Sequence, residues 1–362
     1  MDECPTFPEL NITEWGQVLL KQLKGKRYPL SGMFELTDRC NLDCVHCYIN
    51  QPAACQSARE TELSTGQVKA ILDQLAAAGC LYITFTGGEV FLRPDFADIY
   101  THARRLGLLV TVFTNATLLT PRLANLLAEI PPRGVEVTLY GATRETYENV
   151  TSVPGSYDRC MRGISMLLER KIPLNLKSIL LRQNVHELPE MRSFALERGL
   201  NFRYDGLLWP RLDGSTIPAE YRLTIEELVD LDLNNPERKA ERLRIEKDYG
   251  GVLIRSEYVY ACGAGIQSFH IDSAGKISAC TMARQPSYDL KEIPFNQAWE
   301  SLGEIRKLKR ELETRCQTCD LGGSCQQCPG WSQLVHGNNE TPVDFICQLA
   351  HLRAERLKSS IM

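Results

Sequence analysis

The middle of the sequence alternates short apolar runs, rich in β-branched residues, with longer segments of helical spacing. The runs lie at 32–37, 81–86, 108–114, 134–139, 174–181 and 201–208. The helical segments between them include 65–78, 122–130 and 187–198. Strands that alternate with helices predict a parallel sheet with right-handed crossovers. A doubly wound sheet and an incomplete (β/α) barrel both fit, and either places functional groups at the carboxyl ends of the strands.

The ends of the predicted helices carry recognisable signals. Ser64 and Gln67 have the spacing of a capping box. Gly79, Gly107 and Gly199 stand where a helix must stop before the next strand. The predicted elements therefore agree with the local chemistry at their boundaries.

The rest of the chain has a different character. Residues 211–258 combine Pro/Gly loops with charged helices and are interpreted as a connector. The last hundred residues are rich in cysteine, with short strands expected around "FHIDSAGKIS" (269–278) and a closing helix near 346–358. We therefore divide the chain into an N-terminal segment (1–30), an α/β core (31–210), a helical connector (211–258) and a small cysteine-rich domain (259–362).

Composition and charge exclude several classes of protein. The 362 residues have a net charge of −4, which gives no electrostatic footprint for nucleic acid. No apolar run approaches the ~18 residues of a membrane span, and the N-terminus "MDECPTFPEL" lacks the basic and apolar regions of a signal peptide. We expect a soluble, cytoplasmic protein without a membrane or nucleic-acid partner.

Ten of the fourteen cysteines fall into two groups, which are not expected to pair as disulfides in a reducing compartment. The first group is Cys40, Cys44 and Cys47, in "CNLDCVHC". Such a loop has three uses: structure, zinc binding or a reactive cluster. Zinc prefers four ligands, whereas three thiolates on one tight loop suit a cubane iron–sulfur cluster with one iron free of protein ligands. His46 is a possible fourth ligand, but its position favours packing against the loop or a nucleotide.

This loop, placed after a strand, resembles the cluster loop of the radical S-adenosylmethionine (SAM) superfamily. The stretch "FTGGEV" (85–90) follows the second strand and resembles the Gly-Gly-Glu motif that holds the SAM amino group. The physics agrees, because Gly87 and Gly88 let the backbone approach a ligand and the Glu89 carboxylate suits an ammonium group. Thr114 and Asn115 match positions that contact SAM, and Thr138 matches a hydroxyl that contacts its ribose.

The resemblance covers residues 30–210 and implies a partial (β/α)6 TIM-like barrel. It also implies that one electron from a 4Fe-4S cluster cleaves SAM, and that the resulting 5′-deoxyadenosyl radical abstracts hydrogen from a substrate. Arg203, Tyr204 and Asp205 end the sixth strand facing the same cavity, without an assigned catalytic role.

The second cysteine group resembles the seven-cysteine SPASM extension of this superfamily, which binds two auxiliary clusters. The resemblance assigns Cys262, Cys280 and Cys328 to the first auxiliary cluster, and Cys316, Cys319, Cys325 and Cys347 to the second. A pair of zinc ribbons is the alternative, because Cys-x2-Cys pairs also bind zinc. The chain departs from the pattern in two ways: "CQQC" (325–328) is one residue short, and the stretch "IRSEYVYAC" before Cys262 has Ser256 but no additional thiol to complete the first cluster. One iron of that cluster is then open, or takes a ligand from Ser, water or the substrate.

The resemblance implies SAM and three 4Fe-4S clusters as cofactors, with a flavodoxin- or ferredoxin-type reductant. It favours a ribosomally made peptide as substrate, modified by oxidative crosslinking, and "CQQCPGW" is similar to members among the peptide maturases. Only some 30 residues precede the first strand, so we expect either a separate leader-binding protein as a partner or a substrate that is not a leader-bearing peptide. The alternatives are an enzyme acting on a small molecule, a porphyrin or a sulfatase, and a multi-cluster electron carrier.

Overall fold

The computed structural model describes residues 18, 21–49, 51–249, 257–321 and 324–359, so most of the predicted N-terminal segment, including much of an amphipathic stretch at 12–23, lies outside the described residues. Within them, the main sheet has nine strands in the order β11-β10-β9-β1-β4-β5-β6-β7-β8. The strands are β1 (Ser31–Thr37), β4 (Tyr82–Gly87), β5 (Leu109–Thr114), β6 (Gly134–Thr138), β7 (Leu174–Ile179), β8 (Asn201–Asp205), β9 (Ser268–Ile271), β10 (Lys276–Ser278) and β11 (Tyr288–Asp289). A separate two-stranded sheet pairs β2 (Arg39–Cys40) with β3 (Gln51–Pro52).

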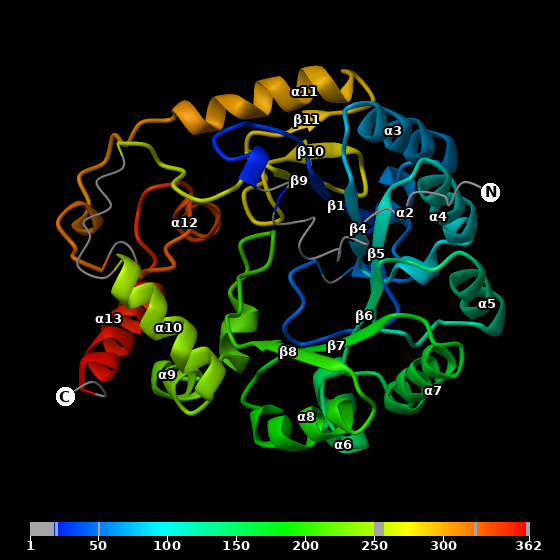
Figure 1. Ribbon diagram of the computed structural model, residues 1–362, viewed down its shortest axis with the longest axis horizontal. Helices are drawn as coiled ribbons and strands as arrows, with labels where there is room; N and C mark the ends of the chain where they lie inside the picture. Colours follow the sequence, from blue (N-terminus) through cyan, green and yellow to red (C-terminus); the bar gives the residue numbers. More distant parts are fainter. Residues whose placement is uncertain (1–17, 19–20, 50, 250–256, 322–323, 360–362) are drawn as a thin grey trace, which may run out of the picture.

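The six predicted strands β1, β4, β5, β6, β7 and β8 are all present and pair in parallel in chain order. Figure 1 shows them curving round a central space, with the helices of the core on the outside. These helices are α2 (Gln56–Thr61), α3 (Thr65–Ala77), α4 (Phe96–Arg105), α5 (Pro121–Glu129), α6 (Arg144–Thr151), α7 (Ser156–Glu169) and α8 (Leu188–Leu196). The predicted α/β fold with parallel strands is confirmed, and its curvature is that of an open barrel.

The predicted helix boundaries are also confirmed. The Ser64 side chain accepts from the Gln67 amide, and the Gln67 side chain accepts from the Ser64 amide. Gly79, Gly107 and Gly199 have φ angles of +83°, +83° and +66°. Glycine adopts this left-handed backbone without the steric cost of a Cβ atom.

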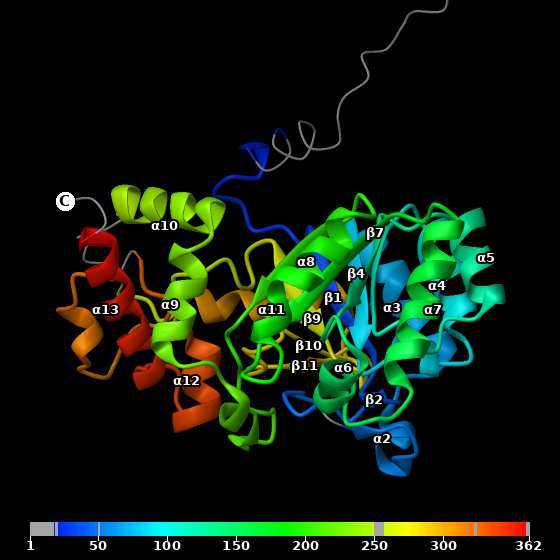
Figure 2. The same ribbon diagram turned by 90° about the horizontal axis from the view of Figure 1, so that it is seen from below.

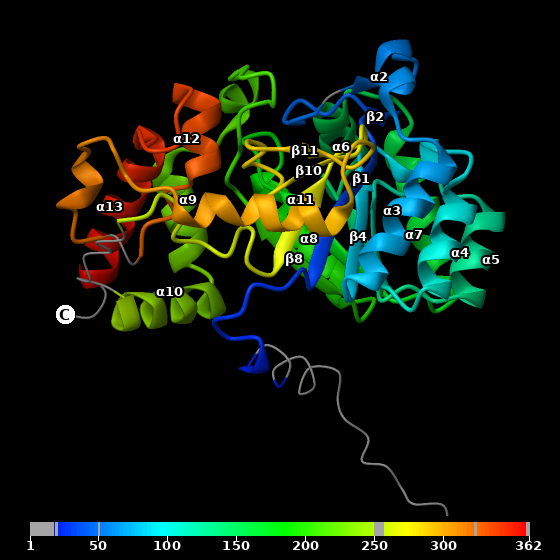
Figure 3. The same ribbon diagram turned by 90° about the horizontal axis from the view of Figure 1, so that it is seen from above.

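The cysteine-rich part is joined to the barrel through the sheet itself. Strand β9 pairs in parallel with the other edge of β1, placing His270 opposite Met33, and β10 and β11 extend the sheet in antiparallel pairs. The sequence predicted short strands in this region but not their pairing with β1. Helix α11 (Phe295–Leu302) follows them and packs against α3, as Figure 3 shows.

The connector helices, the closing helix and one further helix of the cysteine-rich part form a second group at the far end of the molecule from α4 and α5 (Figure 2). They are α9 (Ile225–Leu233), α10 (Pro236–Tyr249), α12 (Pro329–His336) and α13 (Asp344–Ser359). The buried carboxylate of Asp232 on α9 pairs with Arg238, Arg242 and Arg353, and Arg353 lies on α13. One carboxylate thus ties the connector to the closing helix. No described helix is long and apolar enough to span a membrane.

Candidate active site

The two glycines of the Gly-Gly-Glu stretch lie against the segment that leads into the first cysteine group. A Cβ atom on Gly87, whose φ is +133°, would meet the Thr37 carbonyl oxygen at 2.1 Å. One on Gly88 would meet the Arg39 carbonyl oxygen at the same distance. The amide of Gly88 donates to Thr37 and that of Glu89 donates to Arg39. The sequence explained the glycines by the approach of a ligand, whereas here they allow two backbone segments to touch.

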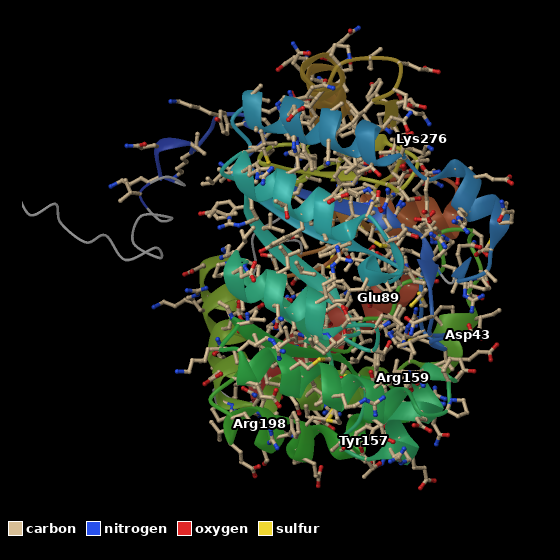
Figure 4. All side chains as sticks on the ribbon, turned by 90° about the vertical axis from the view of Figure 1, so that its right-hand side faces the viewer. Asp43, Glu89, Tyr157, Arg159, Arg198 and Lys276 are labelled. Atoms are coloured by element: carbon tan, nitrogen blue, oxygen red, sulfur yellow. The ribbon has the colours of Figure 1, made fainter. Side chains whose placement is uncertain are left out.

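Glu89 is fully buried at the carboxyl end of β4, and Figure 4 shows it in the interior while Arg198 and Lys276 lie at the periphery. Its Oε1 accepts from the Thr114 hydroxyl (2.7 Å) and the Phe91 amide (3.1 Å). Its Oε2 accepts from the Asn115 amide (2.7 Å). Burial raises the pKa of Glu89 to about 7, although these hydrogen bonds lower it. Among the described residues the Glu89 carboxylate has hydrogen-bond donors but no cation beside it, so an ammonium group of a ligand can pair with it.

Asn115 connects Glu89 to the cysteine loop. Its side-chain Nδ2 donates to Asn41 Oδ1 (3.1 Å) and lies 3.7 Å from Cys40 Sγ. Its Oδ1 accepts from the hydroxyl (2.6 Å) and the amide (2.9 Å) of Thr117, while Asn41 Nδ2 donates to the Thr117 hydroxyl (2.8 Å). Asn41 and Thr117 were missed in the sequence, where their only signal is their position beside Cys40 and Asn115.

The loop that carries Cys40, Cys44 and Cys47 is fixed by its own backbone and by the end of α6. The Cys47 amide donates to the Cys44 carbonyl (3.0 Å), and the amides of Asp43 and Val45 donate to the carbonyls of Thr151 and Val150. Burial raises the pKa of Cys40 to about 12 and that of Cys44 well above its usual value, and the neighbouring thiols add to both shifts. Cysteines whose pKa is raised in this way stay protonated unless a cationic centre lies beside them, as an iron–sulfur cluster supplies.

His46 lies within this loop, whereas Thr138 lies at the end of a strand of the barrel. The His46 ring packs 5.2 Å from the Tyr140 ring, at 59°, and burial lowers the His46 pKa to about 4, so the ring is neutral. This agrees with packing against the protein. Thr138 ends β6 opposite Lys177 of β7, on the half-buried inner face of the sheet.

The described part of the chain contains no three His, Cys, Asp or Glu side chains that converge on a single metal ion. Six cysteines of the second group instead line one cavity of about 950 Å³, namely Cys262, Cys316, Cys319, Cys325, Cys328 and Cys347. Their electrostatic contacts separate into two sets. Burial raises the pKa of Cys328, and the nearby Cys280 and Cys262 raise it further. Burial raises the pKa of Cys325 to about 11, with further contributions from Cys347, Cys316 and Cys319.

The short "CQQC" segment (325–328) is held in place by hydrogen bonds of the Gln327 side chain. Gln327 donates from Nε2 to Cys347 Sγ (3.2 Å) and to the Val343 carbonyl (2.8 Å), and its Oε1 accepts from the Val343 amide (3.1 Å). Gln327 therefore clamps this segment to the start of α13. On the same helix, His351 Nε2 lies 4.0 Å from Cys319 Sγ.

Residues 34–195 match the model of the family described as the Radical SAM superfamily. This match defines the class of the protein, a SAM-dependent α/β enzyme. A relative that is 36% identical covers 84% of this chain and 82% of its own length: the Fe-coproporphyrin III synthase of Methanosarcina barkeri. The chain belongs to the radical SAM superfamily. Membership implies SAM and a 4Fe-4S cluster, which the buried thiols and the Glu89 site fit.

Two further comparisons extend beyond the core. The mycofactocin maturase MftC of Mycobacterium tuberculosis is 28% identical, over 84% of this chain and 78% of that protein. The crystal structure of Streptococcus suis SuiB bound to the precursor peptide SuiA covers 96% of this chain and 84% of that one, with a TM-score of 0.69 at 18% identity. The likeness to SuiB shows that the fold, including the cysteine-rich part, is shared along nearly the whole chain.

Proposed function

We propose that this protein is a radical SAM/SPASM oxidoreductase that modifies a ribosomally made peptide. The observation that carries the proposal is the chain of contacts from Glu89 through Asn115 to Cys40. When bound, SAM and the cluster supply a 5′-deoxyadenosyl radical that abstracts hydrogen from the substrate. Cys40, Cys44 and Cys47 hold that cluster. Gly87 and Gly88 position Glu89 for the SAM amino group, while Thr114, Asn115, Thr138 and His46 line the surrounding site.

The auxiliary clusters are part of the proposal. Cys262, Cys280 and Cys328 hold the first and Cys316, Cys319, Cys325 and Cys347 hold the second. The separation of the thiols into these two sets, by their mutual effects on pKa, supports the assignment. The first cluster has three cysteines, and its remaining iron is either open or bound by Ser, water or the substrate. In this arrangement the region 259–362 acts as the auxiliary-cluster domain, beyond the core (31–210) and connector (211–258).

A peptide substrate is supported by the resemblance to MftC, which is named as a maturase. A leader-binding protein and a flavodoxin- or ferredoxin-type reductant complete the proposed system. The second candidate substrate is an iron-containing tetrapyrrole, because the 36% identical relative is an Fe-coproporphyrin III synthase. Oxidative crosslinking of a peptide leaves electrons on the product, which auxiliary clusters can accept.

The test is 5′-deoxyadenosine formation by anaerobically purified protein supplied with SAM and dithionite, measured together with its iron content. We expect deoxyadenosine, about twelve irons per chain, and loss of the product in a C40A/C44A/C47A variant. The matched control is Cys160→Ala, which removes a buried cysteine of neither group. Zinc without iron, or deoxyadenosine from the triple variant, would refute the proposal. An iron tetrapyrrole precursor of Fe-coproporphyrin III, added to active enzyme, then tests the second substrate by the mass of the product.

A further inference from the structure

The inner face of the barrel carries a row of side chains from three adjacent strands. The register of the sheet pairs Thr138 of β6 with Lys177 of β7, and Lys177 with Arg203 of β8. Side chains of paired residues point to the same face of a sheet. The alternate residues Val137 and Leu176 are completely buried on the opposite face. Thr138, Lys177 and Arg203 therefore lie side by side on the barrel's inner face, beside the strand end that we assign to SAM.

Two of these side chains are cations that share one carboxylate. Arg203 forms an ion pair with Glu136 of β6, and Lys177 Nζ lies 3.9 Å from the same Glu136 carboxylate. The Lys177 ammonium also sits 3.1 Å from the centre of the Phe113 ring. Among the described residues, the ion pairs give these two cations the single carboxylate of Glu136, so the row carries more positive than negative charge when Lys177 is protonated.

The positive charge of the Lys177 ammonium is only partly neutralised by its neighbours. Burial lowers the pKa of Lys177 to about 7, Glu136 partly restores it, and Arg203 lowers it again. At 3.9 Å the contact with Glu136 is too long for a hydrogen bond. Lys177 nevertheless stays about 21% exposed, so a ligand can reach it. An anionic group placed between Lys177 and Arg203 would relieve both the desolvation and the repulsion.

We propose that Lys177 and Arg203 form a subsite for a carboxylate of the substrate. The proposal rests on the proposed function, in which the substrate enters the barrel beside SAM. A planar carboxylate accepts two N–H bonds from the Arg203 guanidinium and one from the Lys177 ammonium. In a peptide this group is an Asp or Glu side chain or the terminal carboxylate, and in a tetrapyrrole it is a propionate. The sequence placed Tyr204 at the same cavity as Arg203 and Asp205, but its side chain faces outward, against Asn235 and Arg238 of the connector.

The test measures the pKa of Lys177 directly, in cluster-loaded protein labelled with 13C at the lysine Cε atoms. The Lys177 signal is assigned by its loss in Lys177→Arg. Glutarate is the probe, and glutaramide, which has the same shape without charge, is its control. We expect glutarate to raise the pKa of Lys177 by about one to three units and glutaramide to leave it unchanged.

Two variants show whether the effect belongs to the subsite. Arg203→Gln should raise the Lys177 pKa without any probe and reduce the response to glutarate. Arg198→Gln, which changes an arginine at the end of α8 that lies outside the row, should respond like the unaltered protein. Equal responses to glutarate and glutaramide, or an unreduced response in Arg203→Gln, would overturn the proposal.

The source of the carboxylate is found with two larger probes. A glutamate-containing peptide and coproporphyrin III are titrated separately, and the one that shifts the Lys177 signal at lower concentration identifies the source. None of these measurements requires SAM cleavage. If deoxyadenosine forms but no carboxylate shifts the pKa of Lys177, the proposed subsite is refuted and the proposed function is not.

Discussion

At the scale of single residues, the Glu89 carboxyl group is buried and accepts hydrogen bonds from uncharged donors. Its three donors are neutral, and no described cation lies beside it. The pKa of Glu89 rises from 4.5 to about 7 because burial outweighs these hydrogen bonds. The carboxyl group therefore stabilises the fold when protonated, fully below its unfolded value of 4.5. That contribution is lost as the pH rises through about 7.

The same shift predicts how SAM binding depends on pH. An ammonium ligand needs the ionised carboxylate, so SAM affinity should rise as the pH increases through about 7. Glu89→Gln should weaken SAM roughly 10- to 100-fold, as expected for a lost charged hydrogen bond, and should flatten the pH profile. Calorimetric titration at several pH values measures both effects. An unchanged profile in Glu89→Gln would show that another group receives the ammonium.

At the scale of elements, the sequence predicts what is local. Apolar alternation and glycine positions located the six parallel strands, and the Gly-Gly-Glu stretch located Glu89 at a strand end. The sequence did not predict which distant segments pair with each other in the sheet. Strand β9 begins 237 residues after β1 does, at Ser268 and Ser31, and nothing in either segment specifies the other. The row of Thr138, Lys177 and Arg203 likewise depends on register, since a shift of one residue would turn each side chain to the other face.

Packing between helix α7 and the segment after β5 positions Asn115. Gly163 of α7 lies against Ala116, and a Cβ atom there would meet the Ala116 carbonyl oxygen at 2.3 Å. Ala116 already has a φ of +60°, which is costly for a residue with a side chain. The helix and the strand end therefore fit together only through glycine.

Gly163→Ala should lower the free energy of unfolding by about 1–3 kcal/mol, the usual cost of overpacking. It should also weaken SAM, because the displaced segment carries the Asn115 amide that binds Glu89. Thermal melting and SAM titration measure the two effects. The control is Gly66→Ala in α3, where the new Cβ meets nothing within 4 Å and helix propensity should increase stability. Equal melting temperatures for the two variants would contradict this account of α7.

At the scale of the whole molecule, one buried network joins the barrel, the cysteine loop and the cysteine-rich part. Glu35 of β1 accepts from the Tyr48 hydroxyl (3.0 Å), next to Cys47, and from Arg284 (2.7 Å), which follows Cys280. Its other oxygen lies 3.2 Å from His270 Nε2 on β9. Burial alone would raise the pKa of Glu35, but His270 and Arg284 outweigh it and lower the pKa to about 2. The charged carboxylate thus holds two cysteine-bearing segments in place.

Glu35→Gln should cost about 3–5 kcal/mol at neutral pH, because it leaves the largely buried Arg284 guanidinium without its partner. In the unaltered protein the carboxylate's contribution is present above its unfolded pKa of 4.5 and is lost as the pH falls toward about 2. The variant should lack that acid dependence. Denaturant unfolding at several pH values measures it, and hydrogen exchange should show faster opening of β9 than of α7. Glu197→Gln, at an exposed pair, is the control and should change stability by less than about 0.5 kcal/mol. If Glu35→Gln unfolds like this control, β9 is held by backbone pairing with β1, and the network does not join the two parts.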